Sequence, residues 1–235
     1  MKEQGIIPVP LDLPGHGTHD EGLGQGFTLD DAIAVVDEAT ATIGQYDLIG
    51  YSMGGRIALH VALARSHRVR RLVLESASPG LSSYRERAER READEQLASM
   101  IEREGIVHFV NWWETIPVLA SQRELPVEVS DRVRRLRIEN DAAALACSLR
   151  GLGTGALPSL WDRLESVECP TLLMVGATDT KFVRVAEEMA TSIPDASLAK
   201  FQGVGHAVHL EAPNMWLRSV VPFLISGRTP LSVKG

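Results

Sequence analysis

The sequence lacks several features that would point to particular classes of protein. Its two cysteines, Cys147 and Cys169, have neither the spacing of a metal site nor that of a disulfide framework, so both are expected to be buried core residues. No apolar run approaches the ~20 residues of a membrane-spanning helix, and the first residues show no signal-peptide pattern. Lys and Arg total 24 against 31 for Asp and Glu, and this net charge of −7 argues against a protein that binds nucleic-acid phosphates.

The rest of the composition is typical of a globular protein. The chain has 235 residues, 44% of them hydrophobic, which suits one large domain or two small ones. It contains no dinucleotide-binding fingerprint, phosphate-binding loop or metal-ligand cluster, so no cofactor and no metal are expected. These features predict a cytoplasmic protein without nucleic-acid or membrane partners, and a monomer is the expected state.

Short apolar runs alternate along the chain with amphipathic helical stretches. The predicted strands are Ile6–Leu11, Tyr46–Tyr51, Val69–Leu74, Thr171–Val175 and Ala196–Phe201. The helical stretches between them are Leu29–Ile43, Gly54–Arg65 and Val183–Ile193. This alternation predicts an α/β fold with a mostly parallel sheet and right-handed crossovers.

One connection is much longer than a crossover requires. It spans residues 77–170 and begins with a charged helical stretch, Tyr84–Glu104. It could hold an extra helix or two, or a helical cap inserted over the carboxyl ends of the strands, where open α/β sheets bind ligands. We favour the cap, which divides the chain into a core of residues 1–76 and 171–235 and a cap of residues 77–170.

The most informative stretch is Gly50–Gly54, Gly-Tyr-Ser-Met-Gly, which fits the G-x-S-x-G pattern. It directly follows a predicted strand and directly precedes a predicted helix, as that pattern requires. A sharp strand-to-helix turn strains its central residue, and glycines beside it let strand and helix approach closely. We therefore expect Ser52 to be an activated serine at the start of a helix, with the Met53 N–H as one oxyanion donor.

A reactive serine needs a base, and the base needs an orienting acid. Hydrolases with this turn supply them in the order Ser, Asp or Glu, then His. Asp179 follows the strand Thr171–Val175, and His206 follows the last predicted strand. His206 is preferred to His209 because it lies between flexible glycines and the next helix, and His209 is expected to pack or orient.

With these motifs the sequence resembles the α/β-hydrolase superfamily. The superfamily pattern is found in Asp12–Gly17, Gly50–Gly55 and Val204–His206. Finer features resemble one family within it, the 2-succinyl-6-hydroxy-2,4-cyclohexadiene-1-carboxylate synthases of menaquinone biosynthesis. These features are Gly54–Arg56, Ser78–Leu81, Glu86–Arg90, Asn111–Trp113, Leu149–Gly155, Pro158–Trp161 and Asp179–Phe182. The resemblance implies the α/β-hydrolase fold with an inserted helical cap.

The same resemblance implies a lyase rather than a hydrolase. The family eliminates pyruvate from 2-succinyl-5-enolpyruvyl-6-hydroxy-3-cyclohexene-1-carboxylate, a small polycarboxylate. Ser52, made basic by His206 with Asp179 as orienter, would remove a ring proton without forming an acyl-enzyme. The developing negative charge would then need prepared donors.

The resemblance also implies which residues bind the substrate. Arginine grips carboxylates in a bidentate manner, and Arg56, Arg90 and Arg137 match positions that the family uses for this. Taken without the resemblance, Arg90 lies in a charged stretch typical of a solvated helix. Trp112 or Trp113 could line the pocket, although core packing is an equal alternative.

The amino terminus departs from the superfamily pattern. Members carry a His-Gly loop ahead of the segment that matches Asp12–Gly17, and that loop supplies the second oxyanion N–H. Only a few residues precede the first predicted strand here, so we expect the amino-terminal strands and this donor to be missing. Two further interpretations stay open. One is a serine hydrolase of esters or C–C bonds, which would use the same triad, and the other, which follows from the missing segment, is a weakly active truncated binding protein.

Overall fold

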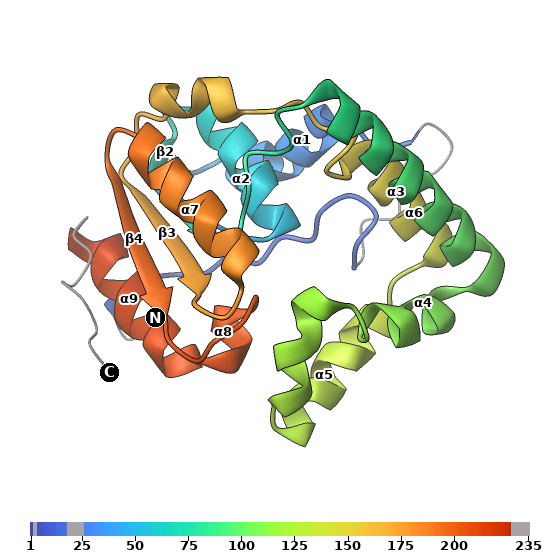
Figure 1. Ribbon diagram of the computed structural model, residues 1–235. Helices are drawn as coiled ribbons and strands as arrows, with labels where there is room; N and C mark the ends of the chain where they lie inside the picture. Colours follow the sequence, from blue (N-terminus) through green and yellow to red (C-terminus); the bar gives the residue numbers. More distant parts are fainter. Residues whose placement is uncertain (2–3, 18–25, 227–235) are drawn as a thin grey trace. The chain divides into compact units, whose positions relative to one another are not determined.

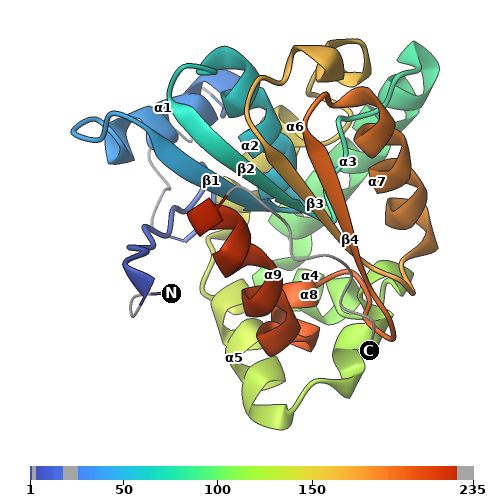
Figure 2. The same ribbon diagram turned by 90° about the vertical axis from the view of Figure 1, so that its left-hand side faces the viewer.

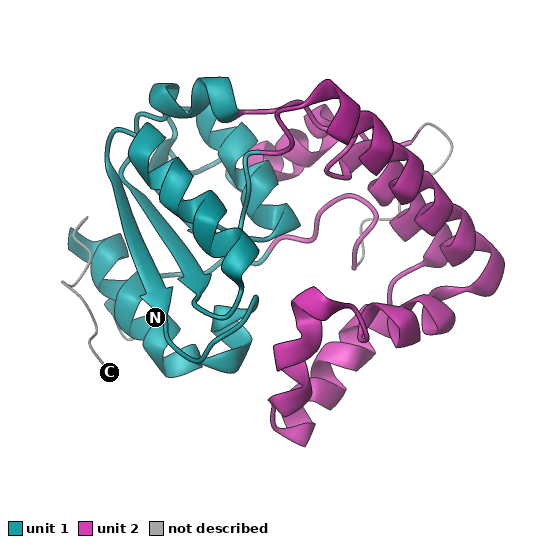
Figure 3. Cartoon of the chain, in the orientation of Figure 1, with its two compact units in different colours: residues 1–10, 40–79, 161–235 teal, residues 11–39, 80–160 magenta. Residues whose placement is uncertain are grey.

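The computed structural model describes residues 1, 4–17 and 26–226, and the chain divides into two compact units (Figure 3). Unit 1 comprises residues 1–10, 40–79 and 161–235, and unit 2 comprises residues 11–39 and 80–160. The boundaries expected from the sequence differ from these mainly at residues 11–39, which group with the helices of unit 2.

Unit 1 contains a parallel four-stranded sheet with the strand order β1-β2-β3-β4 (Figure 1). The strands are β1 (Tyr46–Tyr51), β2 (Val69–Glu75), β3 (Thr171–Gly176) and β4 (Ala196–Phe201). Every residue of β3 is buried, as its continuous apolar sequence predicts. Because all strands run the same way, their carboxyl ends meet at one edge of the sheet. The four strands predicted at these positions are confirmed.

Helices cover both faces of this sheet (Figures 1 and 2). On one face α2 (Met53–Ala64) packs on β1 and β2, and α7 (Thr180–Ser192) packs on β3 and β4. On the other face lie α8 (Val208–Glu211) and α9 (Pro213–Ser226), and the short 3₁₀ helix η3 (Trp161–Ser166) precedes β3. The core under α9 is formed by Val73, Leu172, Met174, Phe201, Val204, Val208, Val220, Phe223 and Leu224.

The prediction of a strand at Ile6–Leu11 is wrong. Residues 6–11 have no strand structure, and the side chains of Ile7 and Val9 are 83% and 54% exposed. Pro8 and Pro10 have no N–H to give to a ladder, so this segment cannot pair along its length as an inner strand would. Among the described residues β1 therefore pairs only with β2.

Unit 2 is helical. Its elements are α1 (Leu29–Ala39), α3 (Tyr84–Glu104), α4 (Ile106–Trp113), η2 (Pro117–Glu124), α5 (Val127–Ile138) and α6 (Ala142–Leu152). The helices α3 and α6 pack through a small core of Ala98, Ile101 and Ala146. The exposed side of the same pair is bridged by Arg150, whose guanidinium contacts both Glu95 and Glu102.

Residues 11–17 group with unit 2, and two of their glycines lie close to the start of α6. A Cβ placed on Gly15 would lie 2.4 Å from the carbonyl oxygen of Ala144, so only glycine fits at this contact. The Gly17 N–H donates to Asn140 Oδ1 at 2.9 Å, just before α6 begins. These contacts join two parts of the chain that the sequence alone assigned to different domains.

The two cysteines behave differently. Cys169 is buried, which confirms the prediction, and burial raises the pKa of its thiol. Cys147 is only half-buried, so the prediction of a core residue is wrong for it, because α6 turns this position partly to solvent.

None of the described helices is both long enough and apolar enough to cross a membrane.

Candidate active site

The turn between β1 and α2 holds Ser52 in a strained conformation. Its φ and ψ are 49° and −110°, a region that residues with a side chain rarely occupy. The Ser52 N–H donates to the Glu75 carbonyl oxygen at 2.8 Å, and the Arg56 N–H donates to the Ser52 carbonyl oxygen at 3.1 Å. Met53 begins α2, so its N–H has no partner within the helix and remains our predicted oxyanion donor.

Two glycines make this turn possible. A Cβ on Gly50 would lie 2.4 Å from the Gly54 carbonyl oxygen, and a Cβ on Gly55 would lie 2.5 Å from the Ala77 Cβ. A Cβ on Gly54 would meet nothing within 4 Å. The close approach of strand and helix therefore depends on Gly50 and Gly55, whereas the glycine that completes the G-x-S-x-G pattern is not sterically required.

The carboxyl ends of β1, β3 and β4 bring Ser52, Asp179 and His206 together. The distance from Asp179 Oδ2 to His206 Nδ1 is 2.6 Å, and that from His206 Nε2 to Ser52 Oγ is 3.0 Å. The side chains of Asp179 and His206 are 8% and 5% exposed. All three belong to unit 1, so this geometry lies within one compact unit.

The carboxylate determines which imidazole nitrogen carries the proton. An ionised Asp179 can only accept, so His206 Nδ1 donates to it and Nε2 is left to accept the Ser52 hydroxyl proton. The other oxygen of Asp179, Oδ1, accepts the Phe182 N–H at 3.3 Å and so caps α7. The arrangement can therefore make Ser52 either a nucleophile or a base.

The loops that carry the acid and the base are fastened to each other, a feature that sequence reasoning missed. The Thr178 N–H and hydroxyl both donate to the Val204 carbonyl oxygen, at 3.0 and 2.8 Å. The Glu211 carboxylate accepts the N–H groups of Gly205 and Ala207, on either side of His206, at 2.6 and 3.0 Å. The only sequence signal is a glutamate five residues after the histidine, and alone it does not reveal what it binds.

Replacing Gly176 by alanine is expected to disturb both loops. A Cβ there would lie 1.9 Å from the Gly205 carbonyl oxygen and 2.3 Å from that of Val204, so backbone must move. We expect the free energy of unfolding to fall by about 1–3 kcal/mol, as for other overpacked sites, with a loss of activity. Urea denaturation followed by tryptophan fluorescence measures this. The control is Gly44→Ala, whose Cβ would meet nothing within 4 Å; equal stability of the two variants would contradict the expectation.

Arg56 lies on α2, one turn after Ser52, and is buried with 6% exposure. Its neighbour one turn further along the same helix is His60, which is also 6% exposed. Burial, helped by the positive charges of Arg56 and Arg163, lowers the pKa of His60 to about 4. The helix behind the reactive serine therefore carries a neutral histidine at neutral pH.

This histidine predicts a loss of stability in mild acid. Because the folded pKa of about 4 lies below the ordinary 6.5, the unfolded chain binds the proton first as pH falls. The free energy of unfolding therefore keeps its full value above pH 6.5 and falls as pH falls toward 4. The loss due to His60 is about 2 kcal/mol at pH 5. Urea titrations at pH 8 and pH 5 measure it. His60→Gln should reduce the difference in the free energy of unfolding between pH 8 and pH 5 by about 2 kcal/mol. The control His67→Gln, at an exposed site, should not reduce it. The same difference in both variants would contradict the prediction.

Arg90 and Arg137 lie in unit 2, and each already binds acceptors there. Arg90 Nε donates to Asp94 Oδ1 at 2.7 Å, within α3. Arg137 Nη1 and Nη2 donate to Glu114 Oε1 and Gln122 Oε1, at 3.3 and 2.7 Å. A guanidinium has five N–H donors, so these bonds leave donors for a further carboxylate on both residues.

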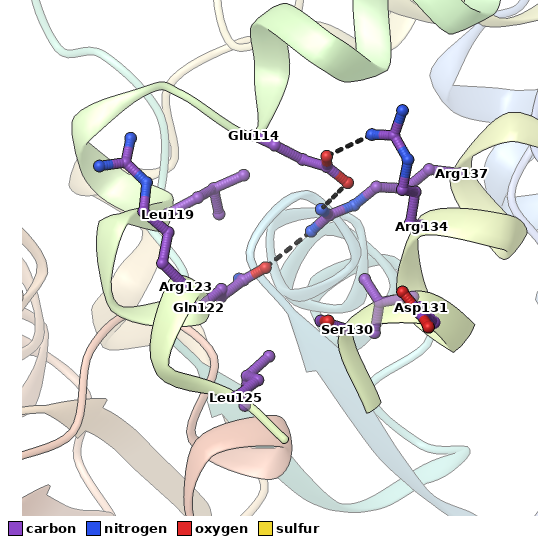
Figure 4. A pocket seen from close by; sticks show the side chains of 10 residues that line it. Glu114, Leu119, Gln122, Arg123, Leu125, Ser130, Asp131, Arg134 and Arg137 are labelled. Atoms are coloured by element: carbon purple, nitrogen blue, oxygen red, sulfur yellow. Dashed lines mark hydrogen bonds and ion pairs between the residues drawn. The ribbon is translucent and has the colours of Figure 1, made fainter. Parts of the chain in front are cut away.

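Arg137 borders a cavity of about 160 Å³ between η2 and α5 (Figure 4). Glu114 lies at its wall and also binds Arg134, so a single carboxylate holds two arginines side by side. Sequence reasoning singled out Arg137 but not Glu114, because the two are far apart along the chain.

Among the described residues no group of three His, Cys, Asp or Glu side chains lies close enough to hold a metal ion.

The two tryptophans at the end of α4 form an aromatic cluster with Phe109. The ring of Trp113 stacks on Phe109 with centroids 5.5 Å apart, and the rings of Trp112 and Trp113 are 6.1 Å apart. Trp112 is 42% exposed and Trp113 is half-buried. Packing within unit 2 therefore occupies one face of Trp113. That Trp112 or Trp113 lines the substrate pocket stays a prediction.

Comparisons with known proteins agree on one family. Residues 3–218 match the model of the alpha/beta hydrolase family. A provisional 2-succinyl-6-hydroxy-2,4-cyclohexadiene-1-carboxylate synthase of Bacillus subtilis is 39% identical over 93% of this chain and 81% of its own. A 2-succinyl-6-hydroxy-2,4-cyclohexadiene-1-carboxylate synthase of Salmonella heidelberg is 32% identical over 89% of this chain and 80% of its own. The solved structure of MenH from S. aureus is similar with a TM-score of 0.88 and 36% identity, over 91% of this chain and 81% of that one.

Proposed function

The chain belongs to the alpha/beta hydrolase family, and we propose that within this family it is a lyase of menaquinone biosynthesis. Its reaction would convert 2-succinyl-5-enolpyruvyl-6-hydroxy-3-cyclohexene-1-carboxylate into 2-succinyl-6-hydroxy-2,4-cyclohexadiene-1-carboxylate and pyruvate. The likeness to named synthases over about nine-tenths of the chain supports this substrate. The same proposal places the enzyme in the cytoplasm, with a small polycarboxylate as its partner.

The observation that carries the proposal is the hydrogen-bonded series Asp179, His206, Ser52. In the proposed step His206 Nε2 takes the Ser52 proton while Ser52 Oγ takes a proton from the substrate ring. The electron pair of the broken C–H bond forms the new ring double bond, and the C–O bond to the enolpyruvyl group breaks. The proton on His206 then passes to the departing enolate, which becomes pyruvate.

Three features of the turn suit this chemistry. The strained backbone presents the Ser52 hydroxyl at the amino end of α2, where the helix dipole favours negative charge. The Met53 N–H is placed there to stabilise the negative charge that develops on the substrate as the ring proton leaves. Ser52 exchanges only protons with His206 and the substrate in this step, so no covalent intermediate forms.

Carboxylate recognition is proposed for Arg56, Arg90 and Arg137, with Trp112 or Trp113 beside the ring. This part rests on the resemblance to the synthases and, for Arg90 and Arg137, on the N–H donors that each guanidinium retains. Arg56 is the member on the same helix as the reactive turn, one helical turn from Ser52.

A pyruvate assay tests the proposal. The chain is mixed with the cyclohexene substrate, and pyruvate is followed by its reduction with a coupled lactate dehydrogenase. We expect continuous pyruvate release at catalytic enzyme concentration. A chain that binds the substrate yet releases no pyruvate, while hydrolysing an activated ester with a burst, would favour the serine hydrolase instead.

A further inference from the structure

A buried carboxylate that the proposed step does not use lies next to the triad. Glu75 is the last residue of β2 and is 1% exposed. Its own backbone carbonyl already binds the Ser52 N–H. A carboxylate this deeply buried is costly unless it is fully hydrogen-bonded, so its partners indicate what it is for.

Both oxygens of Glu75 are occupied by residues from α8 and α9. Oε1 accepts from the backbone N–H of His209 at 3.1 Å and from its Nδ1 at 2.8 Å. Oε2 accepts from Trp216 Nε1 at 2.8 Å. The imidazole of His209 is thereby fixed in position although its side chain is 34% exposed.

The His209 ring leads back to the triad through Tyr51. It meets the Tyr51 ring edge to face, with centroids 4.8 Å apart and an interplanar angle of 66°. Tyr51 in turn packs on His206 at 5.3 Å, and Phe182 meets the His206 ring at 4.7 Å. Tyr51 thus lies in contact with both imidazoles.

These ring contacts supply a restraint that the triad hydrogen bonds cannot. The bonds at Nδ1 and Nε2 hold His206 along a line from Asp179 to Ser52, but they leave the ring able to tilt about that line. Contacts from Tyr51 and Phe182 oppose such tilting.

We propose that His209 is a positioning residue of the active site, anchored by Glu75, whose ring keeps Tyr51 packed against His206. Its effect on turnover rests on the proposed function, whereas its effect on the His206 ring does not. A purely structural alternative is that Glu75 only fastens α8 and α9 to the sheet. The two differ in what happens when the ring and the hydrogen bond are removed separately.

Two substitutions at His209 distinguish the positioning role from the purely structural role. His209→Asn keeps a side-chain donor for Glu75 but removes the ring, and His209→Phe keeps a ring but loses the donor. We expect kcat for pyruvate release to fall about tenfold in H209N with KM within about twofold, and by no more than about threefold in H209F. H209F should lose more thermal stability than H209N, because it leaves a buried carboxylate short of a donor. His67→Asn, at an exposed site in the same unit, is the matched control.

Wild-type kcat in H209N would overturn the proposal. A larger loss of kcat in H209F than in H209N would also overturn it, because it would assign the effect to the hydrogen bond, and equal losses would overturn it because they would not depend on the ring. Nuclear magnetic resonance of wild-type protein labelled in its histidines provides a test that needs no variant and no substrate. We expect cross-relaxation from Tyr51 ring protons to both His206 and His209 ring protons. If the His209 contact is absent, the proposal fails; if it is present in a chain that releases no pyruvate, only the proposed function fails.

Discussion

Replacing Ser52 by alanine is expected to lower kcat for pyruvate release by about 10³–10⁴-fold. The variant removes the oxygen that takes the ring proton, and His206 then faces a methyl group in place of the hydroxyl that lies 3.0 Å from its Nε2. Alanine is smaller than serine and leaves Gly50 and Gly55 untouched, so the turn should still form. Substrate binding through the arginines should be preserved, and the loss should therefore appear in kcat.

The coupled pyruvate assay at high enzyme concentration measures this residual rate. The control is Ser192→Ala, which removes a surface hydroxyl that donates to the Glu188 carbonyl oxygen at 3.2 Å and is expected to leave kcat unchanged. If S52A retained more than about a tenth of the wild-type rate, Ser52 would not be the base. His206 would then have to act on the substrate directly.

Replacing Asp179 by asparagine is expected to have the second largest effect, a loss of about 10²–10⁴-fold in kcat. Asparagine has nearly the same shape, but its amide group can present a donor to His206 Nδ1 and so favour the tautomer whose Nε2 carries the proton. That tautomer cannot accept from Ser52. Because asparagine also caps helices, the bond to the Phe182 N–H that begins α7 can persist and stability should change little.

Activity and urea denaturation measured together test this prediction. The control Asp195→Asn changes an exposed aspartate in the loop before β4 and should alter neither quantity. A D179N protein that is folded and fully active would show that Asp179 serves only as the cap of α7. A D179N protein that is unfolded would instead assign it a mainly structural role.

The parts of this fold that were predictable from sequence depend on local patterns. β3 is a short apolar run buried on both faces, and its place follows from the sequence pattern, although the prediction Thr171–Val175 ends one residue early. The turn at Ser52 was predictable because a strand, a glycine-flanked serine and a helix are contiguous in the chain. Asp179 and His206 could be chosen because each directly follows a strand, and the carboxyl ends of parallel strands meet.

The features that were predicted wrongly or missed depend on backbone donors that the chain lacks or on contacts between distant residues. Ile6–Leu11 has the composition of a strand, but its two prolines cannot donate to a neighbour. Glu75 is an isolated acid at the end of an apolar run, and nothing near it in sequence indicates that it binds His209 and Trp216. The same holds for Glu114, which binds Arg134 and Arg137 from another helix.

In the proposed mechanism Ser52 removes a proton and never bonds to the substrate. This mechanism is tested most directly in one rapidly quenched reaction, by measuring pyruvate, cyclohexadiene product and the intact mass of the enzyme during steady turnover. If Ser52 acts only as a base, one pyruvate is released for each diene formed and the enzyme mass stays unchanged throughout. A transient mass increase located on Ser52, or ester cleavage without pyruvate, would contradict the mechanism.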